Sequence, residues 1–392
     1  YYHAILQNLF FATLSVPQAE RRIIDQSAYP NSNPDYGKPF VFRYHECFEK
    51  EEVIKSMFQA IPFLNGGLFD CLDRRKDHNQ EIEIRLDGFS TKHSKQADFP
   101  NYLFWETHSV DLSEELNTAK AKQTKVLGII ELFEQYVFTV EESTPIEEEI
   151  ALDPELLGRV FENILAFINP ETHETTRKGT GSFYTPRKVV DYMVDASLKE
   201  HLSQELKNHL KMTEVDIDTG LSILFEYSEK EHAFNNREAQ CIVQAIDNCK
   251  VIDPACGSGA FLMGILHRMT HLLSKIDKDN SIWFEKLIER FPAHLQEQMK
   301  NQLERESLTY TRKLGLIQNC IYGVDIQPIA VQIAKLRFFL TLIIEQDIDL
   351  TKDNYGIIPL PNLEFKLVCA DTIATLSEDV TKEDKDYDEF LE

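Results

Sequence analysis

From residue 250 onward the sequence predicts an α/β fold with a parallel sheet. Apolar strand candidates (KVIDPA, CIYGVDI and EFKLVCAD) alternate there with helix candidates at about 259–275 and 328–346. This alternation is typical of parallel sheets, because each crossover helix covers a face of the sheet. An insertion at about 276–315 interrupts the first crossover. The second helix, PIAVQIAKLRFFLTLII, is apolar nearly all round, so we expect the sheet and the N-terminal domain to bury it on two sides.

A mostly helical region precedes this sheet. It defines a first domain over residues 1–150, and residues 151–392 form the second. Residues 1 to about 72 suit helices and end in the turn-forming IPFLNGGLFDCLD. The alternating run EIEIRLDGF predicts an exposed strand or hairpin, and a helix is expected near 124–137.

Two helices are predicted between the first domain and the sheet. DPELLGRVFENILAFI has apolar residues at helical spacing, with Asp153 as its N-cap and Pro154 in its first turn. YTPRKVVDYMVDASL predicts a second helix, with Thr185 as N-cap and Pro186 at the first helical position. Residues 200–248 are expected to be a polar, helical insertion.

Composition bounds the class of protein. The 392 residues are 43% hydrophobic and 27% charged, which suits a globular chain of about two or three domains. No window approaches the roughly 18 apolar residues of a membrane span, and no basic-then-apolar leader is present. Tyr1 lies inside an apolar run and Glu392 inside an acidic run, so we expect a fragment of a longer protein.

Charge and metal-ligand spacing exclude further classes. The net charge of −24 argues against this chain alone gripping nucleic acid, since phosphate contacts need clustered Lys and Arg. The seven cysteines form no CxxC pair, and the twelve histidines form no HExxH pattern. We therefore expect a reducing cytoplasm, no structural disulfide and no metal site.

The stretch VIDPACGSGAFLMG, residues 251–264, runs from a strand through two glycines into a helix. Gly257 and Gly259 allow close backbone approach to a ligand, and the helix that follows directs free N–H groups at it. Leu262 stands where a dinucleotide fingerprint needs a third small residue, and no Gly-Lys-Ser/Thr follows. The form from Asp253 to Gly259 is instead how S-adenosylmethionine methyltransferases begin their sheet, with the acid facing the methionine ammonium.

Two more acids end the later strands. Asp325 lies where an acid can accept hydrogen bonds from ribose hydroxyls, although it also stands three residues before Pro328 and suits a helix cap. It follows Asp253 by 72 residues instead of the usual 20 or so, and the insertion accounts for the excess. Asp371 is placed to accept the exocyclic amine of an adenine, or to make a turn.

The stretch TGSFYTPRKVV brings a loop to a helix N-terminus with no acid in its first turn. Such an end suits a carboxylate ligand, here the methionine carboxylate. Thr-Pro at a helix start is commonplace, so this signal is weak by itself.

Taken in order, five segments resemble a known family: FTVEESTPIEEEIALDPELLGRVFENIL, GSFYTPRKVVDYMV, DPACGSGAFLMG, YGVDIQPIAVQIAKLR and ADT. The chain resembles the gamma-class N6-adenine DNA methyltransferases of type IIG restriction–modification enzymes, in which the FYTP element precedes the glycine loop. ILQNLFFATL, PFLNGGLFD and FPNYLFW resemble the helical region that joins nuclease to methyltransferase in those enzymes.

The resemblance implies a partial Rossmann-like methyltransferase sheet that binds S-adenosylmethionine, in a prokaryotic, cytoplasmic protein. Mg²⁺ is expected only if a nuclease lies outside these residues, and double-stranded DNA is expected to bind through such outside regions, with no membrane partner. The cofactor contacts that it implies are Tyr184, Thr185, Asp253, Ala255, Gly257, Asp325, Ile326, Asp371 and Thr372. Gly259 of the glycine loop is expected to join them.

One departure from the family is decisive for activity. The catalytic Asn-Pro-Pro-Tyr should follow the strand of Asp371, and it does not occur before Glu392. The nearest string, NPDY at Asn33–Tyr36, lies upstream with Asp35 in place of a proline, and we interpret it as a surface turn. We therefore expect these residues to be the linker and cofactor half of an adenine methyltransferase, inactive by itself, with its catalytic residues beyond Glu392.

Two other functions stay open. A regulatory module could bind S-adenosylmethionine and gate an attached nuclease without methyl transfer. A small-molecule methyltransferase is disfavoured by the helical N-terminal region and by FYTP standing before DPACGSGAF.

Overall fold

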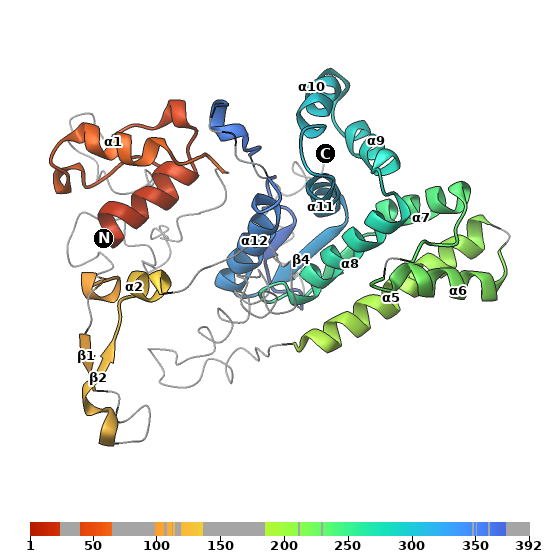
Figure 1. Ribbon diagram of the computed structural model, residues 1–392, viewed down its shortest axis with the longest axis horizontal. Coiled ribbons are helices and arrows are strands. Elements are labelled where there is room, and N and C mark those ends of the chain that lie inside the picture. Colours follow the sequence, from red (N-terminus) through yellow and green to blue (C-terminus); the bar gives the residue numbers. More distant parts are fainter. Residues whose placement is uncertain are drawn as a thin grey trace, which may run out of the picture. The chain divides into compact units, whose positions relative to one another are not determined.

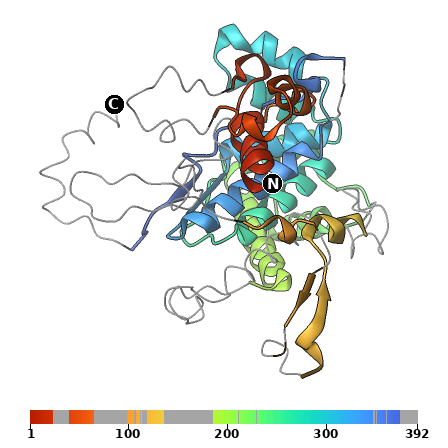
Figure 2. The same ribbon diagram turned by 90° about the vertical axis from the view of Figure 1, so that its left-hand side faces the viewer.

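The computed structural model describes residues 1–23, 40–64, 99–105, 108–111, 113, 119–135, 185–210, 212–228, 230–346, 349, 351–359 and 361–373. The chain divides into two compact units. The first unit holds residues 1–153 and 347–362, and the second holds residues 154–346 and 363–392. Figures 1 and 2 show the elements of both units from perpendicular directions.

Helices form the core of the first unit, as expected for its described part. The π-type helix η1 (Tyr2–Leu14) and the helix α1 (Glu51–Gln59) are joined by loops that include the 3-10 turns η2 (Gln18–Glu20) and η3 (His45–Cys47). Ala12, Phe42, Ile54 and Phe58 make a buried cluster between them. The strand or hairpin expected from EIEIRLDGF and the string NPDY lie outside the described residues.

The helix expected near 124–137 is only partly correct. Thr124–Val126 is a strand, β2, which pairs antiparallel with β1 (His108–Val110), and the helix α2 covers only Ile129–Glu134. β-branched Thr124 and Val126 suit a strand, and the pairing with β1 is a contact that local sequence does not reveal. Two 3-10 turns, η5 (Asn101–Leu103) and η6 (Ala119–Gln123), flank this ribbon.

A segment from the C-terminal half of the sequence completes the first unit. The turn η8 (Asp353–Gly356) has three successive residues at positive φ: Asn354 (51°), Tyr355 (56°) and Gly356 (78°). The Asn354 side chain accepts a bond from Phe63 N (2.6 Å) and donates to Phe63 O (2.8 Å), and Tyr355 Oη donates to Gln59 O (3.0 Å). These bonds hold the segment to the end of α1 although about 290 residues separate the partners.

The second unit contains the expected parallel sheet. Its strands are β3 (Val251–Asp253), β4 (Ile321–Asp325) and β5 (Leu367–Cys369), in the order β3-β4-β5. Val251 pairs with Ile321, and Gly323 pairs with Leu367, both in parallel register. The prediction of three adjacent parallel strands with their carboxyl ends at one edge is confirmed.

Two long helices make the crossovers between these strands. They are α8 (Ala260–Ile276), after β3, and α12 (Pro328–Ile343), after β4. Buried residues lie on every side of α12, which contacts β4, β5 and α11. The sheet therefore covers one side of α12, as expected, and α11 covers another. The burial expected from the N-terminal domain stays a prediction.

Helices α5 (Arg187–His209), α6 (Glu214–Phe225) and α7 (Asn236–Asn248) precede the sheet, so most of the residues expected as a helical insertion, 200–248, are in helices. The expected cap on α5 is wrong. Pro186 occupies the N-cap position, no side chain caps the helix, and Thr185 lies outside it. Pro186 O accepts from the amides of Val189 and Val190 instead. The helix expected over DPELLGRVFENILAFI lies outside the described residues.

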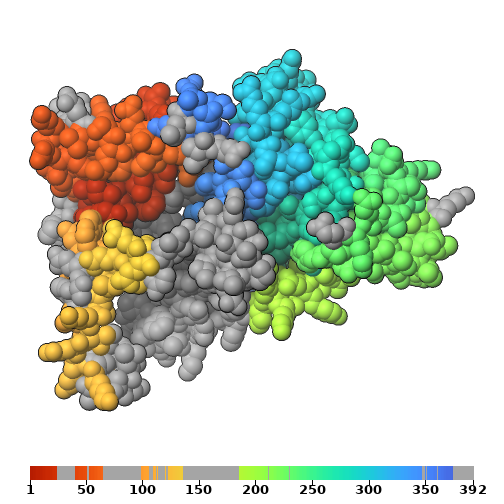
Figure 3. Space-filling model, viewed as in Figure 1, coloured from red at the N-terminus to blue at the C-terminus, as the bar shows by residue number. Residues whose placement is uncertain are grey.

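The insertion expected at 276–315 consists of α9 (Ser281–Glu289), α10 (Ala293–Leu303) and most of α11 (Leu308–Asn319). Figure 3 shows side chains of α9 and α10 (cyan) and of residues 185–248 (green) together on one face of the second unit. None of the helices in the described residues combines the length and apolarity that a membrane crossing requires.

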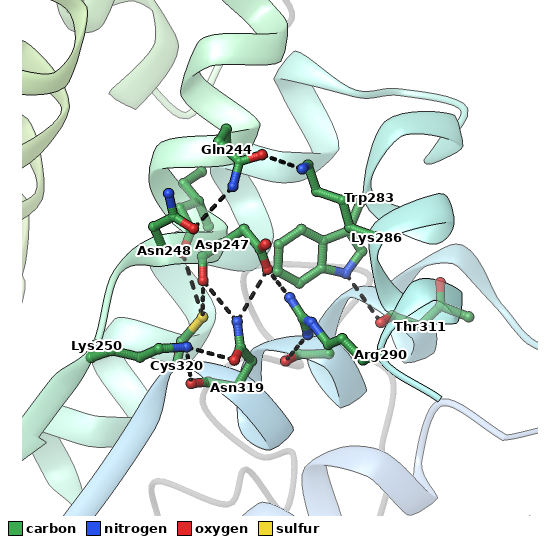
Figure 4. Close-up of polar contacts among 12 residues, drawn as sticks. Gln244, Asp247, Asn248, Lys250, Trp283, Lys286, Arg290, Thr311, Asn319 and Cys320 are labelled. Atoms are coloured by element: carbon green, nitrogen blue, oxygen red, sulfur yellow. Dashed lines mark hydrogen bonds and ion pairs between the residues drawn. The ribbon is translucent and has the colours of Figure 1, made fainter. Parts of the chain in front are cut away.

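A polar network ties this insertion to α7 at the amino ends of the strands (Figure 4). Asp247 pairs with Arg290, and its carboxylate and backbone oxygens also accept from Asn319 Nδ2 (3.1 and 2.7 Å). Arg290 also donates to Gly315 O (3.2 Å), and Trp283 Nε1 donates to Thr311 O (3.3 Å). The contacts of Asp247 with Arg290 and Asn319 fix the insertion at the amino ends of the strands, the edge opposite Asp253 and Asp325.

Candidate functional site

The site begins with the loop between β3 and α8. Its glycines have backbone angles that other residues rarely adopt, with φ +53° at Gly257 and +86° at Gly259. Gly259 also lies close to α12, since a Cβ atom there would meet Cβ of Ala334 at 3.3 Å. The glycines that the sequence singles out are therefore required by the turn and by the close packing of the loop on α12.

Backbone and side-chain bonds hold this loop in place. Cys256 N donates to Val324 O (2.9 Å), and Gly257 N donates to Oδ2 of Asp325 (2.8 Å). From α12, Nη1 of Arg337 donates to Ser258 O at 2.8 Å, and only 2% of the surface of Arg337 is exposed. The sequence reasoning did not single out Arg337. A lone Arg in the apolar run PIAVQIAKLRFF is a signal, because a buried guanidinium needs a partner.

Asp253 ends β3 and stands at the carboxyl edge. Its Oδ1 accepts from Ala255 N at 3.1 Å. Burial raises the pKa of Asp253, the bond from Ala255 opposes that rise, and the nearby charge of Asp325 adds to it. The two carboxylates are therefore electrostatic neighbours, so a cation is the ligand that suits Asp253 best.

Asp325 has two backbone donors. Oδ1 accepts from Gln327 N and Oδ2 accepts from Gly257 N, both at 2.8 Å. The first bond is the local turn before α12 that the helix-cap alternative expects. The second reaches back 68 residues to the glycine loop. An ionised carboxylate has about four lone-pair sites, so these two bonds leave room for hydroxyl donors.

The third acid lies beyond β5. Asp371 is exposed and its Oδ1 accepts from Ile373 N at 2.9 Å, which is the turn that the alternative interpretation expects. Thr372 Oγ1 donates to Pro254 O (3.1 Å) and so joins the end of β5 to the loop after β3. Ile326 exposes 61% of its side chain at the same edge, and Ala255 is exposed in the loop. Because neighbouring strands lie about 4.8 Å apart, the three strand ends fall within roughly 10 Å across the sheet.

Helices α5 and α8 lie side by side (Figure 1). Val190 of α5 packs on Gly264 of α8, where a Cβ atom would approach Cγ1 of Val190 to 2.5 Å. Farther along, Asp195 of α5 pairs with Arg268 of α8. Since both contacts advance together along the two helices, α5 and α8 run parallel and their N-termini lie together. Neither helix has an acid in its first turn, which confirms that expectation for α5.

A small cavity of about 40 Å³ lies between these two N-termini. Its lining includes Thr185 from the start of α5, and Ser258 and Ala260 from the glycine loop and α8. The charged and titratable residues of the lining are Arg187, His267, Arg268, Arg337 and one acid, Asp191, which lies 3.9 Å from Arg187. Asp253, Asp325 and Asp371 are absent from the lining of this cavity. Tyr184 lies outside the described residues.

The structure therefore joins two kinds of site. Two helix N-termini with nearby guanidinium groups suit an anion, and the carboxylates of Asp253 and Asp325 suit a cation and hydroxyl groups. The glycine loop lies between them. A ligand with an α-amino acid at one end and a ribose at the other has this order of groups, so the residues present fit S-adenosylmethionine.

Comparisons with known proteins agree with a methyltransferase. Residues 229–385 match the family described as the DNA-methyltransferase domain of MmeI. A protein of Methanocaldococcus jannaschii, described as a type II restriction enzyme and methyltransferase, is 27% identical over 376 residues, which are 95% of this chain. The chain covers 24% of the length of that relative. No solved structure matches the chain. Most of the segment that matches a DNA-methyltransferase domain thus lies in the second unit, within a chain similar to part of a restriction enzyme and methyltransferase.

Proposed function

We propose that these residues are the linker and S-adenosylmethionine-binding half of a DNA adenine-N6 methyltransferase, in a restriction–modification or phage-defence enzyme of a prokaryotic cytoplasm. The observation that carries the proposal is the glycine loop with two positive-φ glycines, bonded to Asp325 beside Asp253 at the carboxyl edge of a parallel sheet. The match of residues 229–385 to a DNA-methyltransferase domain supports it.

Each part of the site has a role in this proposal. Asp253 receives the methionine ammonium, and the N-terminus of α5 with Thr185 receives the methionine carboxylate. Asp325 accepts from the ribose hydroxyls with the lone pairs that its two backbone donors leave. Gly257, Gly259 and Ala255 pass beneath the nucleoside, Asp371 accepts from the exocyclic amine of the adenine, and Tyr184, Ile326 and Thr372 are further contacts of the ligand.

S-adenosylmethionine supplies an electrophilic methyl group on a sulfonium. The described residues bind and orient the ligand, and none is assigned a part in the transfer to adenine. Adenine N6 is a poor nucleophile because its lone pair is delocalised, so transfer needs acceptors for the N6 hydrogens and a stacking surface for the flipped base. The motif that carries these groups in the family does not occur in these 392 residues.

DNA would be bound by regions outside these residues, and Mg²⁺ would be needed only by a nuclease outside them. Loss of Asn-Pro-Pro-Tyr from the intact protein would favour one second candidate, a module that binds S-adenosylmethionine and gates an attached nuclease without methyl transfer.

Isothermal calorimetry with S-adenosylmethionine tests the proposal, and Asp325 provides its sharpest variants. Asp325→Ala removes bonds that are each worth about 1.5–3 kcal/mol at most, so affinity should fall strongly. Asp325→Asn keeps one oxygen acceptor and serves as the milder variant. If Asp325 binds ribose, Asp325→Asn should weaken adenosine more than 2′,3′-dideoxyadenosine. Equal weakening of both nucleosides would leave Asp325 as a cap of the loop, and no binding by the unchanged chain would refute the proposed function.

A further inference from the structure

A partly buried ion pair ties α5 to α8 behind the site. Nη2 of Arg268 donates to Oδ2 of Asp195 at 2.9 Å, and Nε lies 2.6 Å from Oδ1 as a close ionic contact. The hydrogen bond and the second contact together restrict the orientation of the two side chains as well as their separation. We call this pair the α5–α8 clasp.

The Arg268 end of the clasp is held on several sides. Its side chain is 8% exposed, and Nη1 donates to Phe225 O at 3.1 Å. The guanidinium carbon lies 4.5 Å from the ring centre of Tyr227 and 5.7 Å from that of Phe225. Because Arg268 has so little freedom, the carboxylate that it binds, and with it α5, is fixed relative to α8.

The position of the clasp links it to the site. Asp195 is eight residues after the first residue of α5, and Arg268 is eight residues after the first residue of α8. At a rise of 1.5 Å per residue, the clasp lies about 12 Å from both N-termini. Val190 and Gly264 make a second contact nearer the N-termini. These two contacts bear on both the level and the tilt of α5 on α8, and α5 also packs on α6 and α7.

A tie of this kind has a physical reason. Each helix N-terminus carries about half a positive charge, so two parallel helices with adjacent N-termini repel one another there. Neither helix has an acid in its first turn to reduce that repulsion. The clasp and the Val190–Gly264 contact oppose it and keep the N-terminus of α5 beside the glycine loop.

We propose that Asp195 and Arg268 are positioning residues that set the N-terminus of α5 at the distance from the glycine loop which the carboxylate of S-adenosylmethionine requires. This inference rests on the proposed function and adds to it two residues that act through the placement of α5.

Calorimetry with two ligands tests the clasp on the full chain. S-adenosylmethionine has the amino-acid carboxylate, and 5′-methylthioadenosine has the same nucleoside without it. Asp195→Ala should weaken S-adenosylmethionine by about tenfold, the loss expected when one charge-assisted contact is misplaced, and should leave 5′-methylthioadenosine unchanged. Asp195→Glu, which keeps the carboxylate, should restore part of the affinity.

Two further variants complete the experiment. Gly264→Ala places a methyl group 2.5 Å from Cγ1 of Val190, so it should push α5 away and cause the same selective loss. Lys207→Ala removes an exposed ion pair between α5 and Glu214, 2.8 Å long, and should change neither affinity. Equal weakening of both ligands by Asp195→Ala and Gly264→Ala, or no weakening of either, would overturn the positioning role. Failure of the unchanged chain to bind either ligand is a different result, which would overturn the proposed function together with this inference.

Discussion

At the scale of single residues, the ionised carboxylate of Asp253 lowers the stability of the ligand-free fold but favours ligand binding. Its pKa is raised above the ordinary value of 3.8, first by burial, with the bond from Ala255 opposing and the charge of Asp325 adding. The folded state therefore holds this proton to higher pH than the unfolded state. The contribution of protonated Asp253 to the free energy of unfolding is fully present below pH 3.8. It is lost as the pH rises through the raised pKa of the folded state. At neutral pH, ionised Asp253 destabilises the ligand-free fold.

Asp253→Asn should consequently raise the thermal unfolding midpoint at pH 7, and the gain should disappear near pH 4. The same variant should bind S-adenosylmethionine about tenfold more weakly or worse, because a carboxylate opposite an ammonium is lost. Calorimetry at both pH values measures the two effects. Asp218→Asn, at an exposed position of α6, controls for the loss of one negative charge. A midpoint gain that is the same at both pH values would contradict the role given to burial.

Arg337 is the second residue whose effect is specific. Its guanidinium is 2% exposed and donates to Ser258 O in the glycine loop. Arg337→Met keeps an apolar side chain of similar length but leaves the carbonyl of Ser258 without its charged donor. The free energy of unfolding should therefore fall by about 1.5–3 kcal/mol. Urea unfolding checks this, with Arg305→Met at an exposed position as the control. Equal midpoints for the two variants would show that the bond to Ser258 does not hold the loop.

At the scale of elements, α7 has a complete capping box. Asn235 Oδ1 accepts from Arg237 N (3.0 Å) and Glu238 N (3.1 Å), and Glu238 Oε2 accepts from Asn235 N (2.9 Å). Asn235→Ala should destabilise the second unit by about 0.5–2 kcal/mol in chemical unfolding. The neighbouring Asn236→Ala changes the first helical residue and no cap, so its effect should be small. A larger loss from Asn236→Ala would refute the assignment of the cap.

At the scale of the whole molecule, cofactor binding and methyl transfer should separate. The chain should bind S-adenosylmethionine yet transfer no methyl group to DNA. The Asn-Pro-Pro-Tyr motif, which would hold the N6 hydrogens and stack the base, does not occur in these 392 residues. The net charge of −24 should also keep its DNA affinity low. Tritium transfer from labelled cofactor to adenine-rich DNA is the measurement, with an active adenine methyltransferase as the positive control. Transfer by this chain would mean that a catalytic element lies within it, and NPDY would be the first candidate.

The sequence by itself determined the order of strands and helices in the second unit. Apolar runs such as CIYGVDI and the all-round apolar helix after Pro328 are local signals, because burial on both faces must be written into consecutive residues. The positive φ of Gly257 and Gly259 is equally local, since few other residues adopt it. For the same reason the sequence could place Asp253 and Asp325 at strand ends.

Only the tertiary structure decided which partners these residues meet. Oδ2 of Asp325 binds Gly257 N across 68 residues, and Arg268 binds Asp195 across 73. Asn354 joins the first unit through Phe63, across 291 residues, and Thr124–Val126 is a strand because it pairs with His108–Val110. Periodicity reports which face of an element is apolar, but a charged or polar side chain carries no local mark of the distant group that compensates its burial. The partners follow from packing, which brings together residues that the sequence keeps apart.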